Sequence, residues 1–159
     1  MLDPRIGNVH IDANTLDRIS PAHHSFVDRL LALNESGEIT LIIPHSVKTE
    51  IEHRRTPPRV KLETRDSMYS LPVQRTAQEM ELLVKLRTLL QGNSQSTKHD
   101  ADAEHLFEAS KYGGRFFITH DRRILVRKEK VQSLIGPIEI VSLEEFILIF
   151  DKFVNGETS

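Results

Sequence analysis

Short apolar runs alternate with segments of helical periodicity along most of the chain. Runs at residues 9–12, 41–43, 116–119 and 138–141 are compact and apolar, as buried strands are. Helices are predicted after Ser20-Pro21, from 47 to 53, 76 to 91 and 100 to 111, after Arg122, and from Ser142 to about Phe153. This alternation predicts a three-layer α/β/α fold with a mainly parallel central sheet.

The segment between the second and third of these strands does not follow the alternation of strands and helices. Residues 53–75 are predicted to be irregular, or a helix broken by Pro57-Pro58 and Pro72. The helix predicted at 76–91 should turn its apolar side chains inward, namely Met80, Leu83, Val84 and Leu90. We therefore expect a single domain over residues 1–159, with a basic, proline-containing helical insertion at about 53–98.

Composition narrows the class of protein. The chain has 159 residues with no Cys, which excludes disulfides, thiolate metal sites and thiol catalysis. Lys plus Arg is 21 against 23 Asp plus Glu, so any nucleic-acid surface must be a local patch. The longest apolar run, at residues 146–150, is far below the ~20 residues that span a bilayer, and the start carries no apolar signal region. We expect a cytoplasmic protein without a membrane partner.

Acidic residues follow two of the predicted strands. Asp12 ends the first, and Asp121 follows the strand at 116–119 after His120. In a parallel sheet, ligands bind beyond the carboxyl ends of the strands. Either acid alone could simply cap the next helix, but two acids from different strands favour a shared site.

Two further acids are predicted to join them. Asp102, His105, Leu106 and Ala109 have i, i+3, i+4, i+7 spacing, which places Asp102 on the face that packs on the sheet. Asp100 is assigned as the helix cap before it, although either acid could serve as the third ligand. Glu50 lies one turn into the helix predicted after residues 41–43.

Four converging carboxylates would repel one another unless a cation neutralised them. Oxygen ligands favour Mg²⁺ or Mn²⁺ over zinc. One or two such ions can activate water and stabilise the leaving oxygen of a phosphodiester, so the residues point to metal-assisted phosphoryl chemistry.

The ordered acidic motifs resemble those of the PIN-domain nucleases. The matching segments are Ile11-Asp12-Ala13-Asn14, Ser46-Val47-Lys48-Thr49-Glu50, Asp102 with Ala109, and Phe117-Ile118-Thr119-His120-Asp121. The resemblance implies a Mg²⁺- or Mn²⁺-dependent endoribonuclease. By position it implies that the metal-binding acids are Asp12, Glu50, Asp102 and Asp121, and that Asn14 and Thr119 support the site. In the mechanism that we expect, Asp12, Asp102 and Asp121 hold the metal, and Glu50 completes its charge or orients water.

Small bacterial members of this family include the toxins of VapBC-type toxin–antitoxin pairs. For such a toxin the resemblance implies an antitoxin partner and a homodimer. The long stretch between Glu50 and Asp102 departs from the compact toxin pattern.

Two basic stretches are candidates for RNA contact. Residues 53–66 include Arg54, Arg55 and Arg59, and residues 122–130 begin with Arg122 and Arg123. Phosphate binding would explain both, although a single charged run is more often a solvated face. His99, His105 and His120 flank the third and fourth acids, and either surface exposure or hydrogen bonding to the site would account for them.

Two other functions compete with RNA cleavage. One is an inactive PIN-like scaffold that binds RNA or protein, which metal-dependent cleavage would exclude. The other is a haloacid-dehalogenase-type phosphatase, which would turn over small phosphate monoesters. That chemistry needs Asp-x-Asp after the first strand, and here Asn14 occupies the second position.

Overall fold

The described residues form a five-stranded sheet in which every neighbouring pair of strands is parallel. A computed structural model describes residues 2–16, 20–44, 58, 69–71, 75–92, 100–111 and 114–157. The strands are β1 (Asn8–Ile11), β2 (Thr40–Pro44), β3 (Tyr69–Leu71), β4 (Gly114–Ile118) and β5 (Glu139–Val141), in the order β3-β2-β1-β4-β5. The parallel sheet predicted from the sequence is confirmed.

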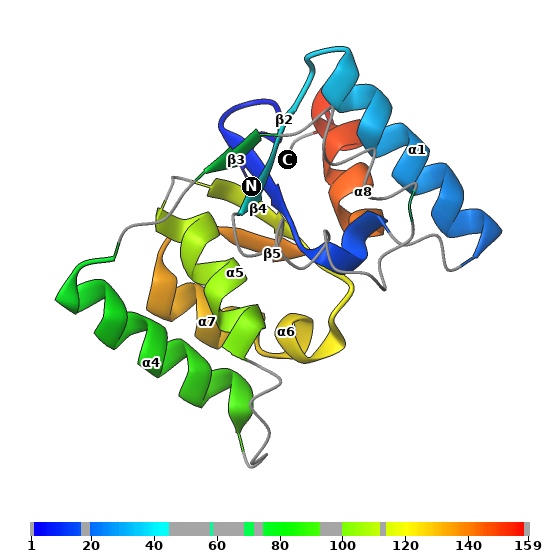
Figure 1. Cartoon of the computed structure of the whole chain (residues 1–159). Coiled ribbons are helices and arrows are strands. Elements are labelled where there is room, and N and C mark those ends of the chain that lie inside the picture. The colour runs from blue at the N-terminus through cyan, green and yellow to red at the C-terminus, as the bar shows by residue number, and fades with distance from the viewer. Residues whose placement is uncertain are drawn as a thin grey trace.

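Helices cover both faces of this sheet, which gives the three layers (Figure 1). They are α1 (Pro21–Glu35), α4 (Ala77–Gln91), α5 (Asp100–Lys111), α6 (Arg122–Val126), α7 (Lys128–Ile135) and α8 (Leu143–Val154), with a 3₁₀ turn η1 (Ala13–Leu16). Helices α1 and α8 lie together on one face, and α4, α5 and α7 lie on the other. The predicted three-layer α/β/α architecture is therefore confirmed.

The core consists of two apolar clusters, one on each face of the sheet. Strand β4 supplies both, because successive side chains of a strand point to opposite faces. Phe116 and Ile118 pack with α1 and α8, whereas Phe117 packs with α5 and α4. The ring of Phe116 meets that of Phe146 edge to face, with centroids 5.4 Å apart. Because apolar clusters cover both faces of β4, its residues Phe116, Phe117 and Ile118 form an uninterrupted apolar run.

The predicted helix starts agree with the structure where they are described. Ser20 Oγ accepts a hydrogen bond from His23 N at 3.3 Å, and Ser142 Oγ accepts one from Glu145 N at 3.2 Å. At the start of α4, Thr76 and Glu79 form a complete capping box. These caps satisfy amide groups that have no partner inside a first turn.

The structure corrects two predictions about buried faces and strands. Met80 and Val84 are exposed, because the buried stripe of α4 runs through Leu83, Leu86 and Leu90 instead. Part of the segment expected to be irregular forms β3, which is too short to give a periodic signal. The short basic helix expected from Arg122 is confirmed as α6, and a second helix that was not expected, α7, follows it. The helix predicted at 47–53 lies outside the described residues.

Among the described helices, none combines the length and the apolar character that a bilayer span requires.

Gly114 begins β4 at a position where a side chain does not fit. A Cβ there would lie 2.6 Å from His10 Nδ1 and 2.7 Å from the Ala109 carbonyl oxygen. Gly114→Ala should therefore lower the free energy of unfolding by about 1–3 kcal/mol, as overpacking does. Urea unfolding measures it, with Ser133→Ala on the exposed side of α7 as the control. An unchanged stability would show that the strand and α5 can separate at this contact.

Candidate carboxylate site

The two central strands bring the first candidate residues together. The chain builds β1, β2 and β3 outward in one direction and then returns to add β4 and β5 on the other side of β1. The strand order therefore reverses between β1 and β4, where open α/β sheets bind their ligands. Ile11 pairs with Ile118, and Asp12 N continues the ladder by donating to Ile118 O at 2.9 Å. Asp12 and Thr119 consequently leave the sheet side by side.

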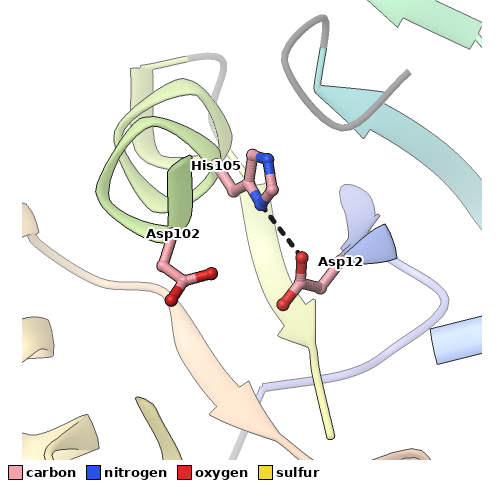
Figure 2. Close-up of side chains that lie close together, drawn as sticks. All are labelled: Asp12, Asp102 and His105. Carbon is pink, nitrogen blue, oxygen red and sulfur yellow. Dashed lines mark hydrogen bonds and ion pairs between the residues drawn. The ribbon is translucent and has the colours of Figure 1, made fainter. Parts of the chain in front are cut away.

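The carboxylate of Asp12 is buried and hydrogen-bonded through both oxygens. Thr119 Oγ1 donates to Oδ2 at 2.8 Å, and His105 Nδ1 lies 2.9 Å from Oδ1. Because an ionised carboxylate can only accept, the His105 nitrogen that faces it carries the proton. Figure 2 shows this contact, with the imidazole reaching from α5 toward the end of β1. Asp12 is 3% exposed and His105 1%, so water screens this contact weakly.

Asp102 approaches the same point from the first turn of α5. Its side chain and that of His105 leave one face of the helix (Figure 2), as the i, i+3 spacing requires. Burial, and then the charges of Asp12 and Asp121, raise the pKa of Asp102 from 3.8 to about 7. A hydrogen bond with Asp121 raises this pKa further, while His105 lowers it. The site thus concentrates negative charge that the protein only partly offsets.

Asp121 lies beside Asp102 and also caps the N-terminus of α6. Its Oδ1 accepts a hydrogen bond from Arg123 N at 2.9 Å and so caps α6. Its own amide donates to Thr119 Oγ1 at 3.0 Å. Thr119 therefore links Asp12 and Asp121 through a single hydroxyl. The capping role considered from sequence and the proximity to Asp102 are both present.

The two loops that follow β1 and β4 are tied together below the acids. Asn14 Oδ1 accepts a hydrogen bond from His120 N at 3.1 Å. Thr15 Oγ1 donates to Ile118 O at 2.7 Å, and this hydroxyl is fully buried. These contacts fix the loop of Asp12 on the loop of Asp121. Asn14 and Thr119, which were predicted to support the site, therefore make polar contacts between the segments that follow β1 and β4.

The donor atoms fit a divalent cation. One donor atom each from Asp12, Asp102 and His105 lies within 4.8 Å of the other two. A cation there would remove the repulsion that raises the pKa of Asp102. Carboxylate oxygens suit Mg²⁺ and Mn²⁺, and an imidazole nitrogen is compatible with Mn²⁺ and later transition metals. Asp121 lies next to Asp102 but outside this tightest group.

Asp100 does not join the site. It is the first residue of α5 and not the cap before it, so the predicted cap is wrong although the predicted bounds, residues 100–111, are confirmed. Its Oδ1 lies 4.0 Å from Arg87 Nε on α4, and Asp100 is not part of the group formed by Asp12, Asp102 and His105. Of the two acids considered for the third position, Asp102 is the one beside Asp12 and Asp121.

The basic residues fall into two groups. Arg122 and Arg123 are exposed at the start of α6, directly after Asp121. The other three basic candidates, Arg54, Arg55 and Arg59, lie outside the described residues. The fourth predicted acid, Glu50, lies outside them as well.

Two histidines lie closer to the site than the sequence alone indicated. Of the two alternatives left open for His105, surface exposure and hydrogen bonding to the site, the structure shows the second, because the imidazole is buried against Asp12. Its i+3 spacing from Asp102 was the available signal. The ring of His120 meets His23 edge-on at 4.4 Å between centroids. Burial, followed by the neighbouring His23, lowers the pKa of His120.

No protein-family model and no curated protein sequence matches this chain. The geometry at the strand ends therefore carries the functional argument.

Proposed function

We propose that this protein is a metal-dependent endoribonuclease that hydrolyses RNA phosphodiester bonds at the carboxyl ends of β1 and β4. The observation that carries the proposal is the convergence of Asp12, Asp102 and Asp121, which raises the pKa of Asp102 to about 7. Buried like charges are costly unless a cation is bound, so such an arrangement favours a metal site over a purely structural role.

Each residue has a task that follows from its contacts. Asp12 and Asp102 would hold the cation, and Asp121 would add charge from the side of α6. Thr119 and His105 fix the carboxylate of Asp12, and Asn14 joins the two loops beneath it. A bound Mg²⁺ or Mn²⁺ would supply the positive charge that a phosphodiester and an attacking water require.

The surface beside the acids supports a polyanionic substrate. Residues 122–130 carry five basic side chains against one acid, and they follow Asp121 without a gap. Arg122 and Arg123 are exposed there. Cations next to a metal site can hold the phosphates that flank the bond being cleaved, and their contribution should weaken with salt.

The contacts of Asn14 disfavour a phosphatase of the haloacid-dehalogenase type. That reaction needs an acid two residues after the first aspartate, to exchange protons with the substrate. Here Asn14 occupies the position, and its oxygen is engaged by the backbone amide of His120. RNA hydrolysis uses the observed acids without requiring a proton-transfer group at residue 14.

RNA cleavage by the purified chain tests the proposal. Labelled single-stranded RNA should be cleaved with Mg²⁺ or Mn²⁺ and left intact with EDTA. Asp121→Asn should lower the rate at least about 100-fold, since part of the several kcal/mol that metal catalysis supplies is lost. Asn is as good an N-cap as Asp, so the cap on Arg123 N is retained and the change reports the charge.

Two variants make this measurement specific. Asp121→Ala removes both cap and charge, and a larger drop in melting temperature than for Asp121→Asn separates folding from chemistry. Asp151→Asn makes the same chemical change in a surface ion pair with Arg29 on the α1–α8 layer, and it should cleave normally. Metal-independent cleavage, or full activity of Asp121→Asn, would refute the proposed site.

A further inference from the structure

The orientation of Asp12 depends on donors from two different elements. Thr119 comes from the end of β4, next to β1, and holds Oδ2. His105 comes from α5, in the layer above the sheet, and holds Oδ1. With both oxygens engaged, rotation of the carboxylate would break at least one hydrogen bond. The side chain is therefore set in one orientation before any cation arrives.

The contact of His105 also spans the two elements that carry the acids. Asp102 lies one helical turn before His105 on α5, and Asp12 directly follows β1. Their like charges act to separate the helix from the sheet, and the hydrogen bond opposes this. On the outer side, Arg87 of α4 contacts Glu104 at 3.2 Å and Asp100 at 4.0 Å. These pairs lie on the outer side of α5, whereas the contact of His105 with Asp12 lies on its inner side, between the helix and the end of β1.

We propose that His105 is a positioning residue, which presents Asp12 to the cation by donating its Nδ1–H to Oδ1. This inference rests on the proposed function, because it assigns a ligand-orienting role to His105 at the same metal site. The proton on Nδ1 excludes coordination through that atom while the hydrogen bond exists. Groups that orient a metal ligand in this way typically change metal affinity by 10–100-fold when they are removed.

Mn²⁺ binding tests the proposal without requiring RNA cleavage. The probe is Mn²⁺ alone, followed by loss of the free-ion electron paramagnetic resonance signal on titration with the folded protein. His105→Asn places an amide N–H close to the position of Nδ1, whereas His105→Leu keeps an apolar side chain of similar bulk without a donor. His105→Asn should bind within about threefold of wild type, and His105→Leu should bind about 10–100-fold more weakly.

Melting temperatures measured without metal separate positioning from packing. The smaller Asn leaves unfilled space in a buried site, so His105→Asn should lose stability yet keep affinity. If the role were structural only, the affinity of both variants would instead follow their stability. His24→Leu, on the exposed side of α1, is the matched control and should leave Mn²⁺ binding unchanged.

The other outcomes are decisive as well. Wild-type affinity in His105→Leu would overturn the proposal. An equal loss in both variants, with nitrogen hyperfine coupling from His105 to bound Mn²⁺ in the wild type, would make it a ligand and overturn the positioning role. Absence of Mn²⁺ binding by the wild type would overturn both this inference and the proposed function. Tight Mn²⁺ binding that follows the expected order without any RNA cleavage would overturn the proposed function alone.

Discussion

Asp12→Asn is expected to abolish metal-dependent RNA cleavage while leaving the fold intact. Metal catalysis supplies several kcal/mol, each 1.4 kcal/mol corresponding to a factor of ten, so the rate should fall by roughly 1,000-fold or more. Asp12 is the acid at the centre of the arrangement, because it contacts His105 and Thr119 and its charge raises the pKa of Asp102. Loss of its charge therefore affects every other group in the site.

The structure explains why the fold should tolerate this substitution. The Asn oxygen can accept from Thr119, and its amide can donate to His105 if the imidazole adopts its other tautomer. Both hydrogen bonds then remain, and only the charge is lost. Cleavage rates with Mn²⁺ and far-ultraviolet circular dichroism measure the two effects, with Asp151→Asn as the control. Wild-type cleavage by Asp12→Asn would show that the catalytic centre lies elsewhere.

Asp102→Asn should stabilise the metal-free protein and remove a pH dependence. Asp102 binds a proton more tightly in the folded than in the unfolded state, with its pKa raised from 3.8 to about 7 by burial and by Asp12 and Asp121. The free energy of unfolding should therefore fall as pH rises from about 4 to 7, and then level off. The shift corresponds to at most about 4 kcal/mol, and solvent screening at this half-buried group reduces it to about 2 kcal/mol.

Thermal unfolding at pH 5 and pH 8 measures this effect. At pH 8 without metal, Asp102→Asn should melt about 4–8 °C above wild type. At pH 5 the difference should be roughly half of that or less, and it should vanish only near pH 3–4, below the ordinary pKa of 3.8. Mn²⁺ should raise the melting temperature of the wild type at pH 8 and have little effect on the variant, because binding to the folded state stabilises it. A wild-type protein whose stability rises between pH 5 and 7 relative to the variant would contradict the repulsion.

Asp151→Asn provides a control of opposite sign. The hydrogen bonds from Arg29 lower the pKa of Asp151. Its contribution to stability is therefore present at neutral pH and lost as the pH falls through the acidic range. The substitution should slightly lower stability at pH 8, by no more than about 1 kcal/mol for a surface pair.

Local sequence patterns were sufficient for the elements whose signals are short-range. Alternation of apolar runs and helical periodicity predicted the parallel sheet, and serine caps marked the starts of α1 and α8. The same reasoning failed for β3, whose three residues acquire strand geometry from pairing with β2. It also misplaced Met80 and Val84, since the buried side of α4 depends on how it packs against α5. Periodicity defines an apolar stripe, but the neighbouring helix determines its boundaries.

The features of the candidate site also fall into two classes, those that local sequence determines and those that tertiary packing determines. The sequence by itself determined that Asp12 and Asp121 follow strands and that Asp102 and His105 share a helix face, because these are consequences of local geometry. Only the tertiary structure decided that β1 and β4 are neighbours, that Asp102 rather than Asp100 meets Asp12, and that His105 is buried against that carboxylate. Each of these depends on strand order and helix docking, which join residues about 90 to 110 positions apart. Contacts over such distances are set by the packing of the whole core, and no local pattern encodes them.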